Sequence, residues 1–97
     1  MKTKILVGGK ELQMELSSGP VIMGRDAHCA VQILDPHVSR SHALLYEEND
    51  KIYLKDLGST NGTFYVKDRL PSTASVQIER DSEFRLAGVS VRIQPAT

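Results

Sequence analysis

The most informative run in this chain is Asp56-Leu57-Gly58-Ser59-Thr60-Asn61-Gly62-Thr63-Phe64. It separates two strand-like runs, so it is predicted to be a loop that a β-sheet holds in place. Its glycines can adopt positive φ, and its short polar side chains favour turns. N–H groups and hydroxyls in such a loop can converge on an anion or on a partner's backbone. The Asn61-Gly62 pair is also a strong hairpin signal, so the run predicts a hairpin turn, a ligand loop, or both.

Short runs of alternating apolar and polar residues continue along the chain on both sides of this loop. Residues 10–16 show the pattern well, because Leu12, Met14 and Leu16 fall on one face of a strand. Turns are predicted at Asn49-Asp50 and Lys67-Asp68. The other strand-like runs are residues 3–7, 21–23, 31–33, 43–46, 52–56, 63–66, 76–78, 84–86 and 89–93. Roughly ten short strands without a convincing helix predict an all-β sandwich or barrel.

The length, charge, apolar runs and cysteine content of the chain limit the classes of function that it can have. The 97 residues suit one domain, residues 1–97, with a thin aliphatic core. The 12 Lys and Arg residues balance the 12 Asp and Glu residues, so nucleic acid and anionic membranes are not favoured partners. No apolar run is long enough for a signal peptide or a membrane span. Cys29 is the single cysteine, which favours a reducing compartment, most simply the cytoplasm.

Three predicted loops carry the candidate site residues: residues 24–30, 35–41 and 57–63. Arg25 follows Gly24 at a strand end, where its permanently charged guanidinium could bind a phosphate or carboxylate, or simply lie on the surface. Ser39 and His42 have the residue types of a nucleophile and its base. Residues three apart in a strand point to opposite faces, and no acid partner is evident, so catalysis is not predicted.

A metal site is not predicted either. The zinc-binding residue types Cys29, His28, His37 and His42 occur here, but their spacing matches no tetrahedral motif. His42 leads into the apolar residues 43–45 and is expected to fix its loop by hydrogen bonds. We therefore expect no enzyme, no metal and no cofactor.

Three runs in this order resemble the motifs of the forkhead-associated (FHA) domain: Met23-Gly24-Arg25-Asp26, Val38-Ser39-Arg40-Ser41-His42-Ala43 and Asp56-Leu57-Gly58-Ser59-Thr60-Asn61-Gly62-Thr63. The resemblance extends over almost the whole chain. It implies a two-sheet β-sandwich of about eleven short, mostly antiparallel strands, with ligand loops at one end. It also implies a signalling module that binds phosphothreonine-containing segments of partner proteins, such as substrates of Ser/Thr kinases. FHA modules are often parts of larger proteins.

The resemblance assigns a role to each matched residue. The implied phosphothreonine-binding residues are Arg25, Ser39, Arg40, Ser59 and Thr60. Asn61 would hydrogen-bond the peptide backbone, and His37 would read a side chain a few residues after the phosphothreonine. The implied loop-supporting residues are Gly24, His42 and Gly62.

Three places depart from the family pattern. Ala30 stands where the family often has an acidic residue, and Arg80-Asp81 stands where a Gly-Asp turn is common. Residues 65–69 stand where the family usually makes a tight Asn-Gly turn, and the segment is one residue longer.

The main alternative function is that of an FHA fold that binds proteins through a sheet face, independently of phosphate. A hydrolase using Ser39 and His42 is disfavoured by its geometry. An oligonucleotide-binding barrel is disfavoured by the zero net charge and the lack of an aromatic platform.

Overall fold

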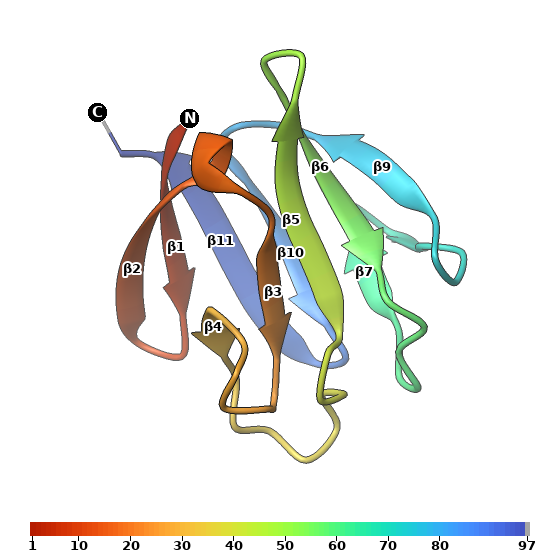
Figure 1. The fold of residues 1–97 in the computed structure, drawn as a ribbon. Coiled ribbons are helices and arrows are strands. Elements are labelled where there is room, and N and C mark those ends of the chain that lie inside the picture. Colours follow the sequence, from red (N-terminus) through yellow and green to blue (C-terminus); the bar gives the residue numbers. More distant parts are fainter. Residues whose placement is uncertain (97) are drawn as a thin grey trace.

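The computed structural model describes residues 1–96, which form two β-sheets packed face to face (Figure 1). The six-stranded sheet has the order β2 (Lys10–Glu15), β1 (Lys2–Val7), β11 (Val89–Pro95), β10 (Ser82–Leu86), β7 (Thr63–Tyr65) and β8 (Asp68–Arg69). The five-stranded sheet has the order β4 (Val31–Gln32), β3 (Val21–Gly24), β5 (Ala43–Glu48), β6 (Lys51–Asp56) and β9 (Ser75–Ile78). The predicted sandwich of about eleven strands is confirmed. The expected domain end at residue 97 lies outside the described residues.

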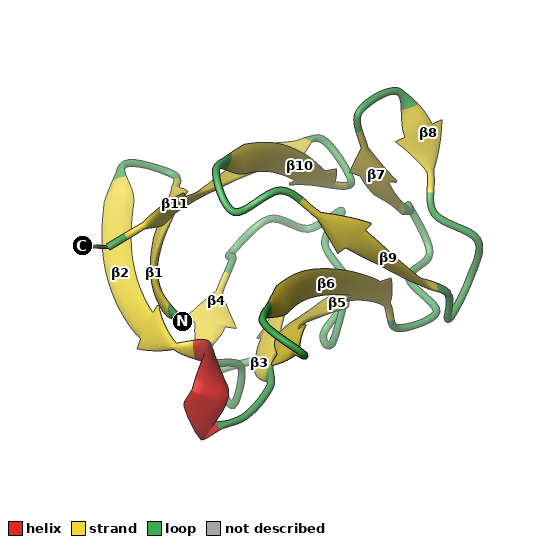
Figure 2. Cartoon of the chain, turned by 90° about the horizontal axis from the view of Figure 1, so that it is seen from above, coloured by secondary structure: helices red, strands yellow, loops and turns green. Residues whose placement is uncertain are grey.

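Most neighbouring strands run antiparallel, and β3 and β4 form a parallel pair. Figure 2 shows the two sheets as separate layers, with β8 beside β7 at the edge of one of them. The predicted Asn49-Asp50 turn is confirmed between β5 and β6, with φ of 52° and 62° at its two residues. In the described part of the chain, no helix is long and apolar enough to span a membrane.

Strand alternation builds the core between the sheets. In β6, Ile52 and Leu54 point inward, and Asp56 continues the same alternation at the last position of the strand. The two sheets also bury Leu45, Phe84 and Ile93, which are at most 1% exposed. Burial of such apolar side chains is the main stabilising term of a thin sandwich. The alternation thus places one carboxylate beneath the loop that follows β6.

The hairpin predicted at Asn61-Gly62 is wrong. The strands on either side belong to different sheets, since β6 lies in the five-stranded sheet and β7 in the six-stranded sheet. Asn61 and Gly62 therefore help to carry the chain across the sandwich, and Gly62 has φ of 90°. Instead of closing a hairpin, the Gly62 carbonyl accepts the backbone N–H of Ala87 at 2.8 Å. The local signal correctly marks a change of chain direction, but the strand partners are set by long-range contacts.

The turn predicted at Lys67-Asp68 is displaced by one residue. Tyr65 pairs with Asp68, so the turn residues are Val66 and Lys67, and Asp68 begins β8. Val66 has φ of 60°, an uncommon value for a β-branched residue, and its side chain is 78% exposed. Residues 65–69, which depart from the family pattern, thus form a tight hairpin with a two-residue turn.

The strand predicted over residues 10–16 also ends one residue early. Leu16 begins a short 3₁₀ turn, η1 (Leu16–Ser18). The Glu15 carboxylate accepts the backbone N–H of Ser17 at 3.2 Å, which caps this turn. A local side-chain bond to the backbone competes here with continuation of the strand.

Candidate functional site

The three loops that carry the candidate residues lie at one end of the sandwich (Figure 1). They follow β3, precede β5 and connect β6 to β7. Loops between strands of a sandwich gather at its two ends, where backbone groups are free to face a ligand. The sequence motifs therefore meet in space although up to about 40 residues separate them along the chain.

His42 joins two of these loops from inside the protein. Its side chain is 0% exposed. Its Nδ1 atom accepts the backbone N–H of Ser39 at 3.0 Å, so the ring proton lies on Nε2, which donates to the Gly62 carbonyl at 2.8 Å. Burial lowers the pKa of His42, which favours this neutral form. The His42 ring thus bridges the backbone of the second loop and that of the third.

Close backbone contact joins the first loop to the second. A Cβ atom on Gly24 would lie 2.2 Å from the Arg40 carbonyl oxygen, so no larger residue fits there without displacing backbone. The N–H of Arg25 donates to the Ser39 carbonyl at 3.0 Å, and the N–H of Asp26 donates to the Arg40 carbonyl at 3.2 Å. Gly24 permits this approach, which brings Arg25 and Ser39 together.

Asp56 shapes the third loop from below. Its carboxylate accepts the hydroxyls of Ser59 and Thr63 and the backbone N–H groups of Gly58 and Ser59. Burial opposes ionisation of Asp56, but these hydrogen bonds outweigh it and lower the pKa of the carboxyl. An ionised, fully bonded carboxylate thus fixes the loop backbone.

Ser59 differs from its expected role in lining a phosphate pocket. Its side chain is buried, and its hydroxyl donates to Asp56 while accepting the N–H of Gly62 at 3.1 Å. Both of these bonds lie within the loop. Ser59 therefore supports the loop from inside, and its hydroxyl does not face the outer surface.

Arg25, Ser39 and Thr60 form a connected set on the outer side of the loops. The Ser39 hydroxyl oxygen accepts the backbone N–H of Thr60 at 3.2 Å. The Nε atom of Arg25 donates to the Val38 carbonyl at 3.0 Å, which orients the exposed guanidinium. Among the described residues this is the only hydrogen bond that the Arg25 side chain makes. Two N–H-bearing nitrogens of the guanidinium are thus left to face an anion.

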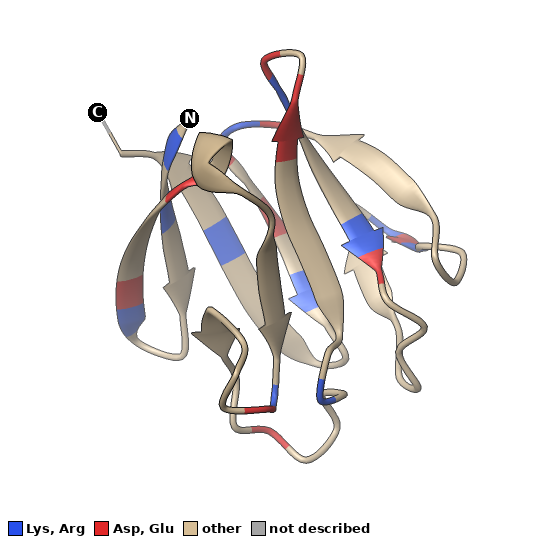
Figure 3. Ribbon diagram, viewed as in Figure 1, with Lys and Arg blue, Asp and Glu red and all other residues tan. Residues whose placement is uncertain are grey.

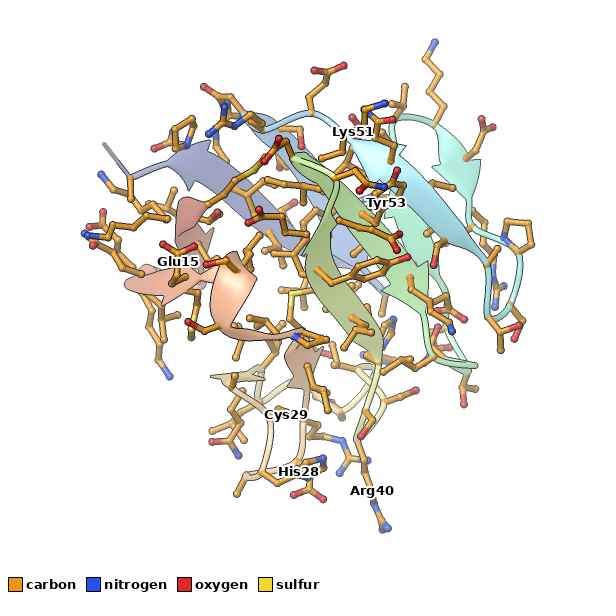
Figure 4. All side chains as sticks on the ribbon, turned by 45° about the horizontal axis from the view of Figure 1, so that its top comes forward. Glu15, His28, Cys29, Arg40, Lys51 and Tyr53 are labelled. Carbon is orange, nitrogen blue, oxygen red and sulfur yellow. The ribbon has the colours of Figure 1, made fainter. Side chains whose placement is uncertain are left out.

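Asn61 and His37 connect the second and third loops near this set. The Nδ2 atom of Asn61 donates to the His37 carbonyl at 2.7 Å. The His37 ring is 75% exposed, with its Nδ1 atom 3.3 Å from the Asp35 carboxylate. Arg40 is also exposed, and its side chain extends away from the protein (Figure 4). These three residues therefore border the same end of the sandwich.

Basic and acidic side chains lie together at this end of the sandwich (Figure 3). Figure 3 shows basic positions directly after β3 and before β5, with acidic positions between them. The acidic side chains are engaged: Asp26 contacts His28 at 2.9 Å, Asp35 contacts His37, and Asp56 is buried. In the described part of the chain, no carboxylate lies within ion-pair distance of Arg25 or Arg40. The arrangement is suited to binding an anionic group.

Sequence reasoning missed two residues that build this end. Asp56 could have been found, because it shares the inward face of β6 with Ile52 and Leu54. Arg69 gave no local signal: its Nη2 atom donates to the Thr60 carbonyl at 3.4 Å because β8 pairs with β7. Across residues 1–96, no group of three His, Cys, Asp or Glu residues is placed to hold a metal ion.

A sequence model of the FHA domain matches residues 21–87, which include the three loops. The chain belongs to the FHA domain family. The FHA domain-containing protein FhaB of Mycobacterium tuberculosis is 31% identical over 83 residues, which cover 86% of this chain and 52% of that protein. The chain thus spans about half the length of this curated relative.

Solved FHA domains share this fold. The FHA-1 domain of Rv1747 from Mycobacterium tuberculosis has a TM-score of 0.84 and 24% identity, with 96% of this chain and 94% of that chain covered. The MEK1 FHA domain, solved in complex with a phosphothreonine peptide of HOP1, has a TM-score of 0.83 and 17% identity, with 99% and 98% covered. The FHA resemblance drawn from the three motifs is confirmed.

Proposed function

We propose that this FHA domain is a non-enzymatic reader of phosphothreonine in partner proteins. The observation that carries the proposal is the connected set of Arg25, Ser39 and Thr60, which comes from three loops. A phosphate at pH 7 has a charge of about −1.5 to −2 and three acceptor oxygens. The related MEK1 domain, solved with a phosphothreonine peptide, supports this choice of ligand.

Each residue of the set offers a different bond to the phosphate. The Arg25 guanidinium can donate two parallel bonds, and such charge-assisted bonds contribute about 1.5–3 kcal/mol each. The Ser39 hydroxyl accepts the Thr60 N–H, so its own proton remains available to a phosphate oxygen. The exposed Thr60 hydroxyl and the Arg40 side chain complete the phosphate-binding group. Ser59 acts through the loop that it supports.

Asn61 is proposed to bind the peptide backbone. One N–H of its amide is used by the His37 carbonyl, which leaves a second N–H and the amide oxygen for the peptide. His37 is exposed beside it and is proposed to contact a side chain that follows the phosphothreonine. An extended peptide held at these points buries little surface, so binding is expected to be reversible and controlled by a kinase and a phosphatase.

The biological setting follows from this ligand class. The partner is proposed to be a substrate of a Ser/Thr kinase, and the proposed location is the cytoplasm. Residues 1–97 are proposed to act as one FHA unit, alone or joined to other domains. No catalytic step is assigned to Ser39 or His42, because the Ser39 hydroxyl bonds to Thr60 and not to the imidazole.

Titration of a phosphothreonine peptide library, with unphosphorylated copies, tests the proposal. The proteins are wild type, Arg25→Ala, and Arg80→Ala as a matched loss of an exposed arginine. We expect Arg25→Ala to weaken phosphopeptide binding at least about tenfold, and Arg80→Ala to leave it unchanged. Equal binding by wild type and Arg25→Ala, or indifference to the phosphate, would overturn the proposal.

A phosphate-independent interaction face is the second candidate. The rings of Tyr46 and Tyr53 stack with centroids 5.4 Å apart on the outer side of the five-stranded sheet. Aromatic side chains are enriched at protein interfaces. Binding of a partner that survives Arg25→Ala and is lost in Tyr53→Ala would favour this face.

A further inference from the structure

We propose that Arg69 makes this FHA domain select partners with a second anionic group close to the phosphothreonine. The inference rests on the proposed function and adds a requirement on the partner sequence. The second group is a carboxylate or another phosphate, within about three residues of the phosphothreonine.

Arg69 reaches the proposed phosphate site through a single residue. Its Nη2 atom is 3.4 Å from the Thr60 carbonyl oxygen, and the N–H of Thr60 is bonded to the Ser39 hydroxyl at 3.2 Å. Because only the Thr60 backbone separates the two bonds, Nη2 lies within about 10 Å of the Ser39 hydroxyl oxygen. An extended peptide advances about 3.3 Å per residue, which sets the reach of about three residues.

The Arg69 side chain is held in this position by its neighbours. A Cβ atom on Gly62 would lie 2.7 Å from the Arg69 Nε atom, so the missing side chain at Gly62 provides the space that the guanidinium uses. Pairing of Arg69 with Phe64 anchors its backbone in the sheet. A cation that is already positioned loses less conformational entropy when it binds.

Arg69 has no anionic partner within the described residues. No carboxylate of residues 1–96 lies within ion-pair distance of it. Neighbouring residues of a strand point to opposite faces, so Asp68 does not share the face of Arg69. Arg85 differs, because its guanidinium carbon lies 4.7 Å from the centroid of the Phe64 ring and the cation is engaged there. Arg69 is therefore a positioned cation with donors left for an external group.

An anionic side chain of the partner fits those donors. A carboxylate and a phosphate both accept two parallel bonds from a guanidinium. The site is exposed to solvent, so screening reduces the gain in affinity to roughly three- to tenfold. A residue with this modest, position-dependent effect acts on selectivity and leaves phosphothreonine binding itself intact.

A positional scan tests this role. A phosphothreonine peptide with alanine at its other positions serves as the background, and a single aspartate is moved through the positions on either side. A second arm places phosphoserine at the responding position. Fluorescence anisotropy gives the Kd for wild type, Arg69→Gln and the matched control Arg85→Gln.

We expect one position at which aspartate strengthens wild-type binding roughly three- to tenfold. Arg69→Gln should remove that gain and Arg85→Gln should keep it, and both variants should still prefer the phosphorylated background peptide to its unphosphorylated copy. A larger gain with phosphoserine than with aspartate identifies a second phosphate as the preferred group. An unchanged aspartate gain in Arg69→Gln, or no responding position in wild type, overturns the inference. A wild-type protein that ignores the phosphate of the background peptide overturns the proposed function instead, and the inference falls with it.

Discussion

The Nδ1 atom of His42 accepts the backbone N–H of Ser39 at 3.0 Å, whereas the Ser39 hydroxyl bonds to the N–H of Thr60. The spacing of Ser39 and His42 therefore builds a loop and does not pair a nucleophile with a base. The His42 imidazole fixes the backbone of Ser39 and so positions the Ser39 hydroxyl. The buried side chains of His42, Asp56 and Ser59 support the loops. The outer side chains of Arg25, Ser39 and Thr60 remain available to a ligand.

His42→Ala should destabilise the fold and weaken phosphopeptide binding together. The change removes two hydrogen bonds and leaves a cavity in a fully buried position, so we expect a loss of about 2–4 kcal/mol in the free energy of unfolding. Urea denaturation followed by fluorescence or circular dichroism measures it. His28→Ala, at an exposed ring, should leave the midpoint essentially unchanged. A fully stable His42→Ala protein would contradict the supporting role.

Stability should fall as the pH drops below the ordinary pKa of histidine. Burial lowers the pKa of His42, so between about pH 6.5 and its lower folded value the unfolded chain binds a proton that the folded chain does not. The free energy of unfolding is therefore highest above this window and decreases through it. His42→Gln should flatten this decrease, because the variant lacks the buried imidazole. Parallel curves for wild type and His42→Gln would refute the assignment.

Gly24→Ala should disrupt the contact between the first two loops. The added methyl group would overlap the Arg40 carbonyl oxygen, so the backbone must shift, at a cost of about 1–3 kcal/mol. Phosphopeptide affinity should fall as well, because Arg25 and Ser39 are positioned by that contact. Gly88→Ala is the matched control, since nothing lies within 4 Å of its added Cβ atom. Similar melting temperatures for the two variants would be inconsistent with this packing.

Asp56→Asn tests the buried carboxylate. The amide nitrogen cannot accept the bonds that one carboxylate oxygen now accepts, so we expect a loss of about 2–4 kcal/mol in unfolding free energy. Asp50→Asn, at an exposed turn position with φ of 62°, should be nearly neutral because asparagine tolerates this conformation. The lowered pKa of Asp56 also means that its contribution is present above about pH 4 and is lost on acidification. Equal urea midpoints for the two variants at pH 7 would argue against the role of Asp56.

His37→Asp should change the preferred residue after the phosphothreonine and keep the dependence on phosphate. The exposed ring is replaced by a carboxylate, which favours basic side chains in the peptide and disfavours acidic ones. A phosphopeptide library profiled against both proteins measures the shift. Arg25→Ala serves as the contrasting variant, because it should weaken binding at least about tenfold without changing the preferred residue. An unchanged profile would remove His37 from the selectivity role.

The strand content, the thin aliphatic core and the FHA family could all be predicted from the sequence. These features rest on local or ordered information: period-two alternation as in residues 10–16, turn residues such as Asn49-Asp50, and motifs around Arg25, Ser39 and Thr60 that keep their order. The alternation of apolar and polar residues over residues 51–56 also indicates that Asp56 lies on the buried face of its strand. Such patterns require no knowledge of which strands are neighbours.

Only the tertiary structure decided which groups touch. It showed that Asn61-Gly62 crosses between sheets, that Ser59 faces inward to Asp56, and that Arg69 lies against Thr60. The reason is that hydrogen-bond partners such as His42 and Gly62 are set by strand pairing and loop packing over long sequence separations. Local propensity specifies where the chain turns, but the pairing of distant strands specifies what each turn faces.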